Sequence, residues 1–392
     1  MRRILRRDFE ERKVERKKVS VISFTEKGMK LSEELKARVK ADIQVFLYTK
    51  RNKYKGESEE VSVCEESLYA WAKDRFLQKQ AVIFIGACGI AVRTVAPLLK
   101  DKLQDIPVLV IDEVGRFVIP ILSGHYGGAN ELAEEIAGKM GMTAVITTAT
   151  DVNRLFAVDV FARKNHLVIV NKDGVKEISA SVLGGEAVTI AIDAPCEGNI
   201  PKELVLVDLE AFRAFADIHD MRSSRDFQEL RKAGHFPAVS ILVSPYRREG
   251  IQAKLRLVPK VFFIGIGCRK GKQETEIGRA VNTYAEMMGI SLEAIAGIAS
   301  VDRKKEEEGL IALARENGWE FLTFTKEELE KVPGDYKASA FVKSQVGVDN
   351  VCERSAMAAC GQDAKLVLGK QAKDGVTIAI AMRKWSVSFH EI

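Results

Sequence analysis

The sequence lacks the residue spacings that hold a metal ion in a protein site. Its 5 histidines form no His-x-x-x-His pair, and its 6 cysteines form no Cys-x-x-Cys pair. Structural and catalytic zinc sites need such clusters, so we expect no metal site, and any metal is expected to arrive with a ligand. The cysteines are spread through the chain and are expected to be reduced in the cytoplasm. They are Cys64, Cys88, Cys196, Cys268, Cys352 and Cys360.

Long apolar runs are absent as well. No stretch reaches the roughly 18 to 20 residues that a membrane-spanning helix needs. The N-terminal sequence MRRILRRDFEERKVERKK has no apolar segment that could serve as a signal peptide. We therefore expect a cytoplasmic protein that does not bind membranes. With only 9 prolines, 46% hydrophobic and 29% charged residues, the composition is that of a folded chain rather than a disordered one.

The chain also has little excess charge of either sign. Lys and Arg number 60 against 55 Asp and Glu, a balance of +5. Residues 1–18 alone hold nine basic and four acidic side chains, so the rest of the chain is neutral. Binding to a phosphate backbone usually needs a basic patch on the folded domain, and nucleic acid is therefore not an expected partner. We interpret residues 1–18 as a solvated, partly helical extension.

Apolar, β-branched runs alternate with helical patterns through the first part of the chain. Helix-like patterns cover 32–39 and 130–139. This alternation predicts an α/β fold with a mainly parallel N-terminal sheet flanked by helices. The strands are expected at 19–25, 81–86, 107–112, 117–122 and 144–148.

A chain of 392 residues is long enough for two or three domains. We expect an N-terminal α/β domain at 19–150, a middle α/β segment at 151–245, and a separate compact C-terminal α/β domain at 261–392. The stretch 246–260 is charged and contains proline, which favours a linker. Further strands are expected at 167–171, 187–193, 204–208, 238–245, 320–324, 338–342, 365–369 and 376–382, together with a strand and Gly-rich turn at 261–273 and a helix near 274–288.

A first candidate site is the Gly-rich turn in IGACGIAVRTVAPLLKDK at 85–102. Small residues where a strand leads into a helix let backbone N–H groups approach an anion. A plain tight turn explains the glycines equally well, and the spacing is not that of a Walker A loop. The candidate ligand-binding residues are Gly86, Gly89, Arg93 and Lys102.

A second candidate site is denser and lies at 111–137. A histidine between glycines at a strand end can be exposed and have a pKa close to neutral, which suits activation of water as a general base. Alternatively, the glycines only shape the loop and His125 only hydrogen-bonds to backbone. The polar and glycine residues at these strand ends are Asp112, Glu113, Ser123, Gly124, His125, Gly127, Gly128 and Asn130.

Two more clusters lie at predicted strand ends. Thr147, Thr148 and Asp151 follow one strand, although the threonines can equally cap the next helix. In the C-terminal domain, cationic groups at strand ends suit carboxylates as well as phosphates. Cys268 has no basic partner identifiable from the sequence and is a weak candidate nucleophile. The candidate binding residues of this domain are Gly267, Arg269, Ser300 and Lys304.

Several long motifs occur in an order typical of one family. GACGIAVRTVAPLL, DEVGRFVIPILSGHYGGANELA and ITTATD resemble the N-terminal domain of the cobalt-precorrin-5A hydrolase family. GIGCRKG, IASVDRKKEEEGL, QVGVDNVCERSAM and VTIAIA resemble its C-terminal domain, so the likeness covers nearly the whole chain. The middle segment carries it least. Around Asp349 and Asn350 the sequence departs from the family's small-residue and proline pattern.

The resemblance implies opening of the ring-A acetate δ-lactone of cobalt-precorrin-5A by water. The two-carbon bridge then leaves as acetaldehyde, giving cobalt-precorrin-5B. The substrate would be an anionic cobalt corrinoid that carries its own cobalt, with no further cofactor, and other enzymes of cobalamin synthesis are candidate partners. The carboxylates of such a macrocycle would be bound by Arg93, Lys102, Arg269 and Lys304, and Glu353 is assigned to the same binding site.

Our hypothesis for the chemistry places His125 at its centre. The imidazole would activate water for attack on the lactone carbonyl, oriented by Asp112 or Glu113. Backbone N–H groups near Gly127 and Gly128 would stabilise the oxyanion.

Two rival functions follow from the same sequence. A corrinoid carrier without catalysis would bind the macrocycle and release no acetaldehyde. A nucleotide-binding enzyme would bind a nicotinamide or adenine nucleotide, but its support is one Gly-x-Gly turn, and no acidic residue clearly fills the ribose-binding position.

Overall fold

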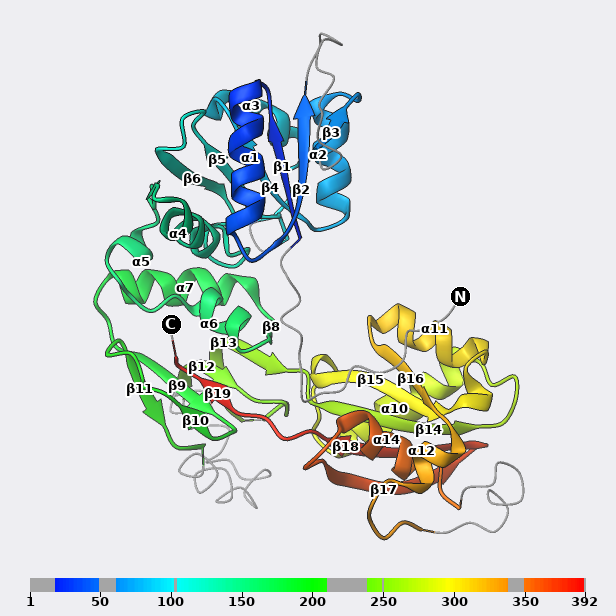
Figure 1. Ribbon diagram of the computed structural model, residues 1–392. Helices are drawn as coiled ribbons and strands as arrows, with labels where there is room; N and C mark the ends of the chain where they lie inside the picture. Colours follow the sequence, from blue (N-terminus) through cyan, green and yellow to red (C-terminus); the bar gives the residue numbers. More distant parts are fainter. Residues whose placement is uncertain are drawn as a thin grey trace. The chain divides into compact units, whose positions relative to one another are not determined.

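The computed structural model describes residues 18–48, 61–101, 104–209, 238–248, 250–337 and 349–390. The chain divides into two compact units, Met1–Val160 and Phe161–Ile392, here called the N-terminal unit and the C-terminal unit (Figure 1). No helix in the described ranges is both long and apolar enough to cross a membrane.

The N-terminal unit is built on a seven-stranded sheet with the order β3-β2-β1-β4-β5-β6-β7. The first five of these strands are mutually parallel. The sheet changes direction at β6, which is antiparallel to β5, and β7 is parallel to β6. The strands are β1 (Lys18–Ser23), β2 (Asp42–Tyr48), β3 (Val61–Cys64), β4 (Ala81–Ile85), β5 (Val108–Ile111), β6 (Phe117–Leu122) and β7 (Thr143–Ala144).

Helices cover both faces of this sheet (Figure 1). On one face, α1 (Glu26–Arg38) and α4 (Ala129–Met140) contribute Leu35 and Leu132 to a core with the strands. On the other face, α2 (Leu68–Leu77) and α3 (Cys88–Val95) contribute Trp71 and Val95. The central strand β4 is buried along its whole length, as expected for a parallel strand covered on both sides. A short helix, α5 (Ala149–Val152), follows β7.

The C-terminal unit contains two five-stranded sheets, which we call the middle sheet and the C-terminal sheet. The middle sheet has the order β11-β9-β12-β13-β8, in which only β8 is antiparallel to its neighbour. Helix α7 (Lys172–Leu183) packs on it. Helix α6 (Val158–Lys164) begins in the N-terminal unit and ends in this one. The strands are β8 (Leu167–Ile169), β9 (Val188–Ile192), β11 (Leu204–Val207), β12 (Ala238–Val243) and β13 (Gln252–Pro259).

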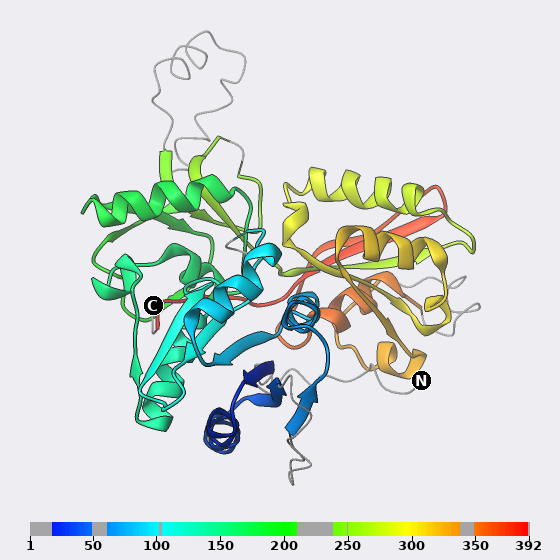
Figure 2. The same cartoon turned by 90° about the horizontal axis from the view of Figure 1, so that it is seen from above.

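The C-terminal sheet has the order β16-β15-β14-β18-β17. Helices α10 (Glu274–Met287) and α11 (Glu308–Asn317) cover one face, and α14 (Cys352–Cys360) covers the other (Figure 2). Helix α12 (Lys326–Glu330) packs beside α14. The strands are β14 (Phe262–Cys268), β15 (Ile295–Val301), β16 (Glu320–Phe324), β17 (Lys365–Lys373) and β18 (Val376–Met382).

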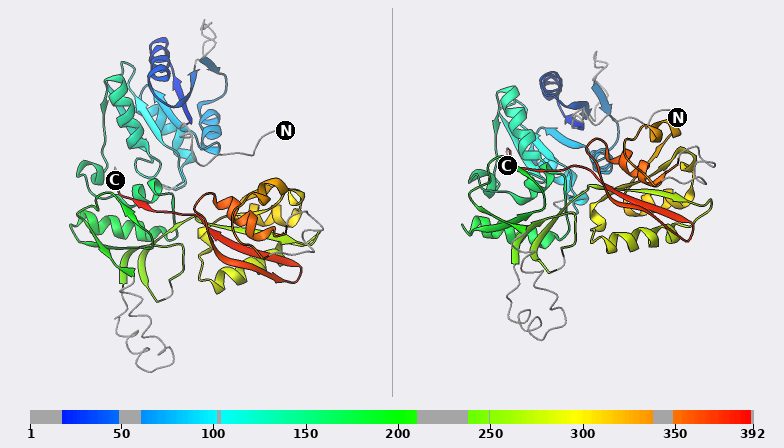
Figure 3. Two further views of the ribbon diagram at one scale, coloured as in Figure 1. Left: turned by 60° about the horizontal axis from the view of Figure 1, so that its bottom comes forward. Right: turned by 90° about the horizontal axis from the view of Figure 1, so that it is seen from below.

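The chain returns to the middle sheet region after β18. Figure 3 shows this last segment, in red, reaching strands of the middle region. There β19 (Val387–Ser388) pairs with β10 (Cys196–Glu197), and Phe389 stacks on Phe161 with ring centroids 5.2 Å apart. Asn165 accepts a hydrogen bond from the Ser388 N–H and donates one to its carbonyl. Residues 387–389 are therefore part of the C-terminal unit's packing.

The predicted α/β fold class is confirmed, and two local predictions are wrong. The stretch 246–260 is not a linker, because Gln252–Pro259 is strand β13 with Leu255 and Leu257 fully buried. The run at 144–148 is not a strand beyond Ala144, since the chain leaves the sheet there and leads into α5. The expected strand at 338–342 and nearly all of the expected extension, residues 1–17, lie outside the described residues.

Candidate active site

Strand direction separates the predicted N-terminal site residues. Asp112 follows the end of β5, whereas His125 follows the end of β6, and these strands are antiparallel. The carboxyl ends of β5 and β6 therefore point in opposite directions, so Asp112 and His125 lie at opposite ends of these two strands. Asp112 shares its edge with Gly86, whose N–H donates to the Ile111 carbonyl at 2.9 Å.

The expectation that Asp112 or Glu113 orients the imidazole is wrong. The Asp112 carboxylate accepts the backbone N–H groups of Arg116 and Phe117, at 2.8 and 2.6 Å, and so closes the turn between β5 and β6. Glu113 accepts a hydrogen bond from the Thr25 hydroxyl, at the start of α1. Both carboxylates therefore make their hydrogen bonds at the end of the strands opposite to the end where His125 lies.

Backbone contacts shape the loop that carries His125. Ser123 has a left-handed φ of 54°, and its hydroxyl donates to the Asp105 carbonyl at 2.8 Å. The N–H groups of Ala129 and Asn130 bond the carbonyls of Ser123 and Gly124. A side chain on Gly124 would meet Asn130 Oδ1 at 2.7 Å. Ser123 and Gly124 therefore have structural roles here, as the loop-shaping interpretation predicts.

The two following glycines differ in what their backbone offers. The Gly128 N–H donates to the His125 carbonyl at 2.9 Å, so it is not available as the oxyanion donor that we expected. Gly127 lies so close to Ser123 that a Cβ atom would come within 2.4 Å of the serine Cβ. The Gly127 N–H has no partner within the part of the chain that the structure describes, and it can donate to a ligand.

The His125 ring lies in a polar cluster of residues from three helices. Its Nε2 atom is 2.7 Å from Asp151 Oδ2 and 2.9 Å from the Thr150 hydroxyl, both on α5. Its Nδ1 atom is 3.6 Å from Asp159 Oδ1 on α6, an ion-pair distance rather than that of a short hydrogen bond. The Asn130 amide, at the start of α4, donates to Asp151 Oδ2 at 2.6 Å and to the Thr148 hydroxyl at 3.0 Å.

This cluster, which we call the His125 cluster, consists of His125, Asn130, Thr150, Asp151 and Asp159. The sequence prediction included three of them and missed Thr150 and Asp159. Thr150 lies inside the TTATD motif, so its position was a usable signal. Asp159 lies in the apolar segment LFAVDVFA outside any motif, and it is buried. A carboxylate in such a segment needs a partner, and His125 is one.

The surroundings of His125 favour its charged form. The Asp159 carboxylate beside Nδ1 is the largest cause that raises the pKa of the imidazole above its ordinary value. Burial acts in the opposite direction, and the charges of Asp159 and Asp151 raise the pKa further. The net result is a raised pKa, so the ring holds its proton more tightly than a histidine in water.

We expect His125 to stabilise the folded protein at acid and neutral pH. In the unfolded chain an imidazole has a pKa of about 6.5. Because the folded pKa is higher, the stabilisation is fully present below about pH 6.5 and is lost as pH rises through the folded pKa. Urea unfolding of the wild type and of His125→Gln should therefore give a difference in free energy of unfolding that shrinks toward alkaline pH. A difference that stays constant with pH would contradict a charged ring.

The remaining predicted residues of the N-terminal unit lie apart from this cluster or outside the described residues. Gly89 and Arg93 are on the exposed side of α3. Thr147 is exposed, and Thr148 is the N-cap residue of α5, but its hydroxyl accepts the Asn130 amide and bonds no N–H of that helix. Lys102 is not among the described residues.

Two predicted binding residues of the C-terminal domain are structural. Ser300 is fully buried, and its hydroxyl donates to the Ile266 carbonyl at 2.7 Å. Glu353 is 2% exposed. Its carboxylate accepts the backbone N–H groups of Lys337 and Lys370, at 3.0 and 2.6 Å, and the Asn350 amide. Neither side chain can contact a substrate, because both are enclosed and fully hydrogen-bonded. Their assignment to substrate binding is wrong.

The other C-terminal candidates lie at the carboxyl ends of β14 and β15. Lys304 pairs with Glu307 at 2.7 Å, and Arg269 is exposed. Gly267 is packed against the Thr377 hydroxyl. Burial is the largest cause of a raised pKa at Cys268, which keeps the thiol protonated and argues against a nucleophile.

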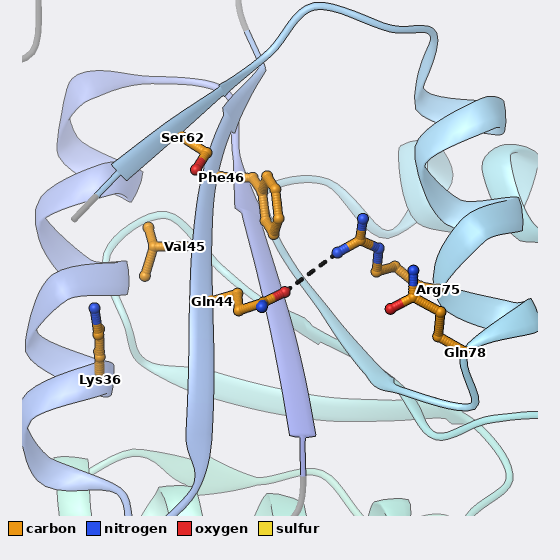
Figure 4. Close-up of a pocket in the computed structure, with 7 residues that line it drawn as sticks. All are labelled: Lys36, Gln44, Val45, Phe46, Ser62, Arg75 and Gln78. Atoms are coloured by element: carbon orange, nitrogen blue, oxygen red, sulfur yellow. Dashed lines mark hydrogen bonds between the residues drawn. The ribbon is translucent and has the colours of Figure 1, made fainter. Parts of the chain in front are cut away.

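One open cavity of about 640 Å³ lies at the far edge of the N-terminal sheet from β6 and β7. Figure 4 shows Arg75 reaching toward Gln44, with 3.3 Å between Nη1 and Oε1. Arg75 also pairs with Asp74 at 2.7 Å and packs over the Phe46 ring. None of the predicted site residues that the structure describes lines this cavity. The lining residues are Lys36, Gln44, Val45, Phe46, Ser62, Arg75 and Gln78.

Three family models match consecutive parts of the chain. Residues 70–151 match the cobalamin synthesis G N-terminal family, residues 156–259 the cobalamin biosynthesis central region, and residues 262–381 the cobalamin synthesis G C-terminus. The matches leave out the N-terminal strands β1–β3 and include β13 in the central region, not in a linker.

Curated relatives are similar over most of the chain. A cobalt-precorrin-5A hydrolase of Salmonella typhimurium is 34% identical over 314 residues, covering 79% of this chain and 84% of that protein. The cobalt-precorrin-5A hydrolase of Priestia megaterium is 28% identical over 372 residues, covering 93% and 94%. Among solved structures, a cobalamin biosynthesis protein G homolog from Sulfolobus solfataricus is 22% identical, covers 94% of this chain and 97% of its own, and has a TM-score of 0.37.

Proposed function

Because this chain belongs to the cobalamin synthesis G family, which includes curated cobalt-precorrin-5A hydrolases, we propose that it hydrolyses a cobalt-corrinoid lactone at the His125 cluster. The main support for this reaction is the sequence identity with a named cobalt-precorrin-5A hydrolase over most of both chains. In this proposal water opens the ring-A acetate δ-lactone of cobalt-precorrin-5A. Acetaldehyde then leaves, and cobalt-precorrin-5B is the product.

The chemistry requires two bond cleavages. Water first adds to the lactone carbonyl, and the carbon–oxygen bond to the ring alcohol breaks. The freed alcohol then loses its proton, and a retro-aldol-like cleavage releases acetaldehyde while the conjugated macrocycle accepts the electron pair. Both steps need a base beside the substrate. Cobalt enters as part of the substrate in this proposal.

The His125 cluster has the groups that these steps require. It combines an imidazole, two carboxylates and the amide of Asn130 at one edge of a sheet. The neighbouring Gly127 N–H is a candidate donor to the oxyanion. The exposed side chain of Arg93, in the same unit as His125, is a candidate for binding a carboxylate of the macrocycle.

The test is an anaerobic incubation of the purified protein with the lactone-bearing cobalt corrinoid. We expect one acetaldehyde per corrinoid consumed and a product mass that reflects loss of the two-carbon unit and gain of water. Tight corrinoid binding without acetaldehyde would contradict the hydrolase and support the carrier function instead.

A further inference from the structure

Carboxylates face both ring nitrogens of His125. Asp151 Oδ2 lies 2.7 Å from Nε2, and Asp159 Oδ1 lies 3.6 Å from Nδ1. A ring nitrogen that faces a carboxylate oxygen does so favourably only as an N–H donor. When both nitrogens are donors the ring is an imidazolium. It then has no lone pair with which to take a proton from water.

Asp151 is held through one oxygen only. Its Oδ2 atom accepts hydrogen bonds from His125 Nε2 and Asn130 Nδ2, at 2.7 and 2.6 Å. Its Oδ1 atom has no partner among the residues that the structure describes. The Asp151 side chain is 33% exposed, against 16% for His125 and 10% for Asp159. Asp151 is therefore the most accessible of the three ionisable groups, and its outer oxygen can accept a proton.

We propose that Asp151 Oδ1 is the general base of the lactone hydrolysis, and that His125, Asn130 and Asp159 are positioning residues. This assignment rests on the proposed function. His125 and Asn130 fix the orientation of the carboxylate through Oδ2. Asp159 pairs with the opposite side of the imidazole and keeps it positively charged.

The proton transfers balance with Asp151 alone. Water bonds through its oxygen to the lactone carbonyl carbon and gives one proton to Asp151 Oδ1. When the carbon–oxygen bond to the ring alcohol breaks, Asp151 returns that proton to the alcohol oxygen. Asp151 becomes a carboxylate again through that transfer, and the new carboxylic acid releases its own proton to solvent.

The same carboxylate can serve the second cleavage. Asp151 takes the proton of the freed alcohol, and the carbon–carbon bond breaks with its electron pair moving into the macrocycle. Acetaldehyde leaves, and the proton passes from Asp151 to the macrocycle. No oxidant or reductant is needed, because the electrons lost by the alcohol carbon are held by the ring.

The charged groups that face the ring agree with this division of roles. Among the described residues, the titratable groups against His125 are Asp151 on α5 and Asp159 on α6. Thr150 faces Nε2 with an uncharged hydroxyl, which can accept the same N–H. Two anions around one imidazole favour the cation. This environment suits a positively charged histidine that holds Asp151 in position. A histidine that acts as a base would instead need one ring nitrogen without a proton.

Paired isosteric variants distinguish the two assignments. Asp151→Asn removes the base, and we expect kcat to fall about 10²- to 10⁴-fold. His125→Gln can keep an N–H donor toward Oδ2, and we expect a fall of at most about tenfold, the scale of one charge-assisted hydrogen bond. Glu134 is an exposed carboxylate of α4, and Glu134→Gln is the matched control that should keep wild-type kcat.

An equal loss of kcat in Asp151→Asn and His125→Gln, or a larger loss in His125→Gln, would overturn the assignment.

A second measurement does not depend on turnover. In protein labelled with ¹⁵N-histidine, the resonances of His125, identified by their absence in His125→Gln, should show both nitrogens protonated at neutral pH. Asp159→Asn should move the ring's titration to lower pH. If the wild-type ring is uncharged at neutral pH, the positioning role of a charged His125 is wrong, even if acetaldehyde is released. Absence of acetaldehyde from the wild type would instead refute the proposed function.

Discussion

His125→Ala is expected to lower the rate of acetaldehyde release by about 10²-fold or more. The substitution removes the hydrogen bond to Asp151 Oδ2 and the positive charge beside it. The Asp151 carboxylate can then rotate away from the position in which Oδ1 faces the substrate. The expected loss is larger than for His125→Gln, because alanine can supply no N–H group. Single-turnover measurements of acetaldehyde, with substrate above KM, give the size of the effect.

The control for this experiment must separate catalysis from folding. His125→Ala leaves the buried Asp159 beside a cavity, so the variant's urea midpoint should be measured at the assay pH. If the variant is folded under assay conditions and its turnover is close to that of the wild type, the His125 cluster is not the site of hydrolysis. The exposed control Glu134→Gln should match the wild type in both measurements.

The fold class could be read from the sequence because buried strands and amphipathic helices leave different periodicities. Strands β16 and β18 lie where the apolar runs predict them. The direction of a strand leaves no such trace. FVIPIL at 117–122 has the same apolar character as the parallel strand before it, yet β6 runs antiparallel to β5. Because of that reversal, which no periodicity reveals, Asp112 and Glu113 lie away from His125.

The wrong linker at 246–260 has a different origin. Charged residues and a proline suggested a connection, but polar and apolar residues alternate from Gln252 to Leu257, which is the pattern of a strand. The charged side chains of this segment alternate with Leu255 and Leu257, which enter the core. In this segment the two-residue alternation of polar and apolar side chains predicts the structure better than the composition does.

The candidate site is partly predictable from the sequence because three of its members lie in two motifs. His125 and Asn130 come from one motif and Asp151 from another, and the fold brings them together through β6, β7 and α5. Asp159 could not be assigned a role from sequence alone, since its partner is known only once α6 is placed. Glu353 shows the reverse error. The family resemblance predicts a binding role for this residue, but it is buried and bonds the backbone of Lys337 and of Lys370 in β17.

Glu353→Ala is expected to destabilise the C-terminal unit by roughly 3–5 kcal/mol. The carboxylate accepts the backbone N–H groups of Lys337 and Lys370, and its loss leaves both donors without that acceptor. The Asn350 amide also loses its bond to Oε2. Urea unfolding followed by tryptophan fluorescence suits this unit, because Trp319 and Trp385 pack against its core.

Two further variants decide between a structural and a binding role for Glu353. Glu353→Gln keeps one acceptor oxygen and should lose less stability than Glu353→Ala. Glu330→Ala, on the surface of α12 with its side chain 50% exposed, should change the free energy of unfolding by less than about 0.5 kcal/mol. An anionic corrinoid has no reason to approach a buried carboxylate, so KM for the substrate should change little in any folded variant. If Glu353→Ala were as stable as the wild type and raised KM, the binding role would be correct and the structural one wrong.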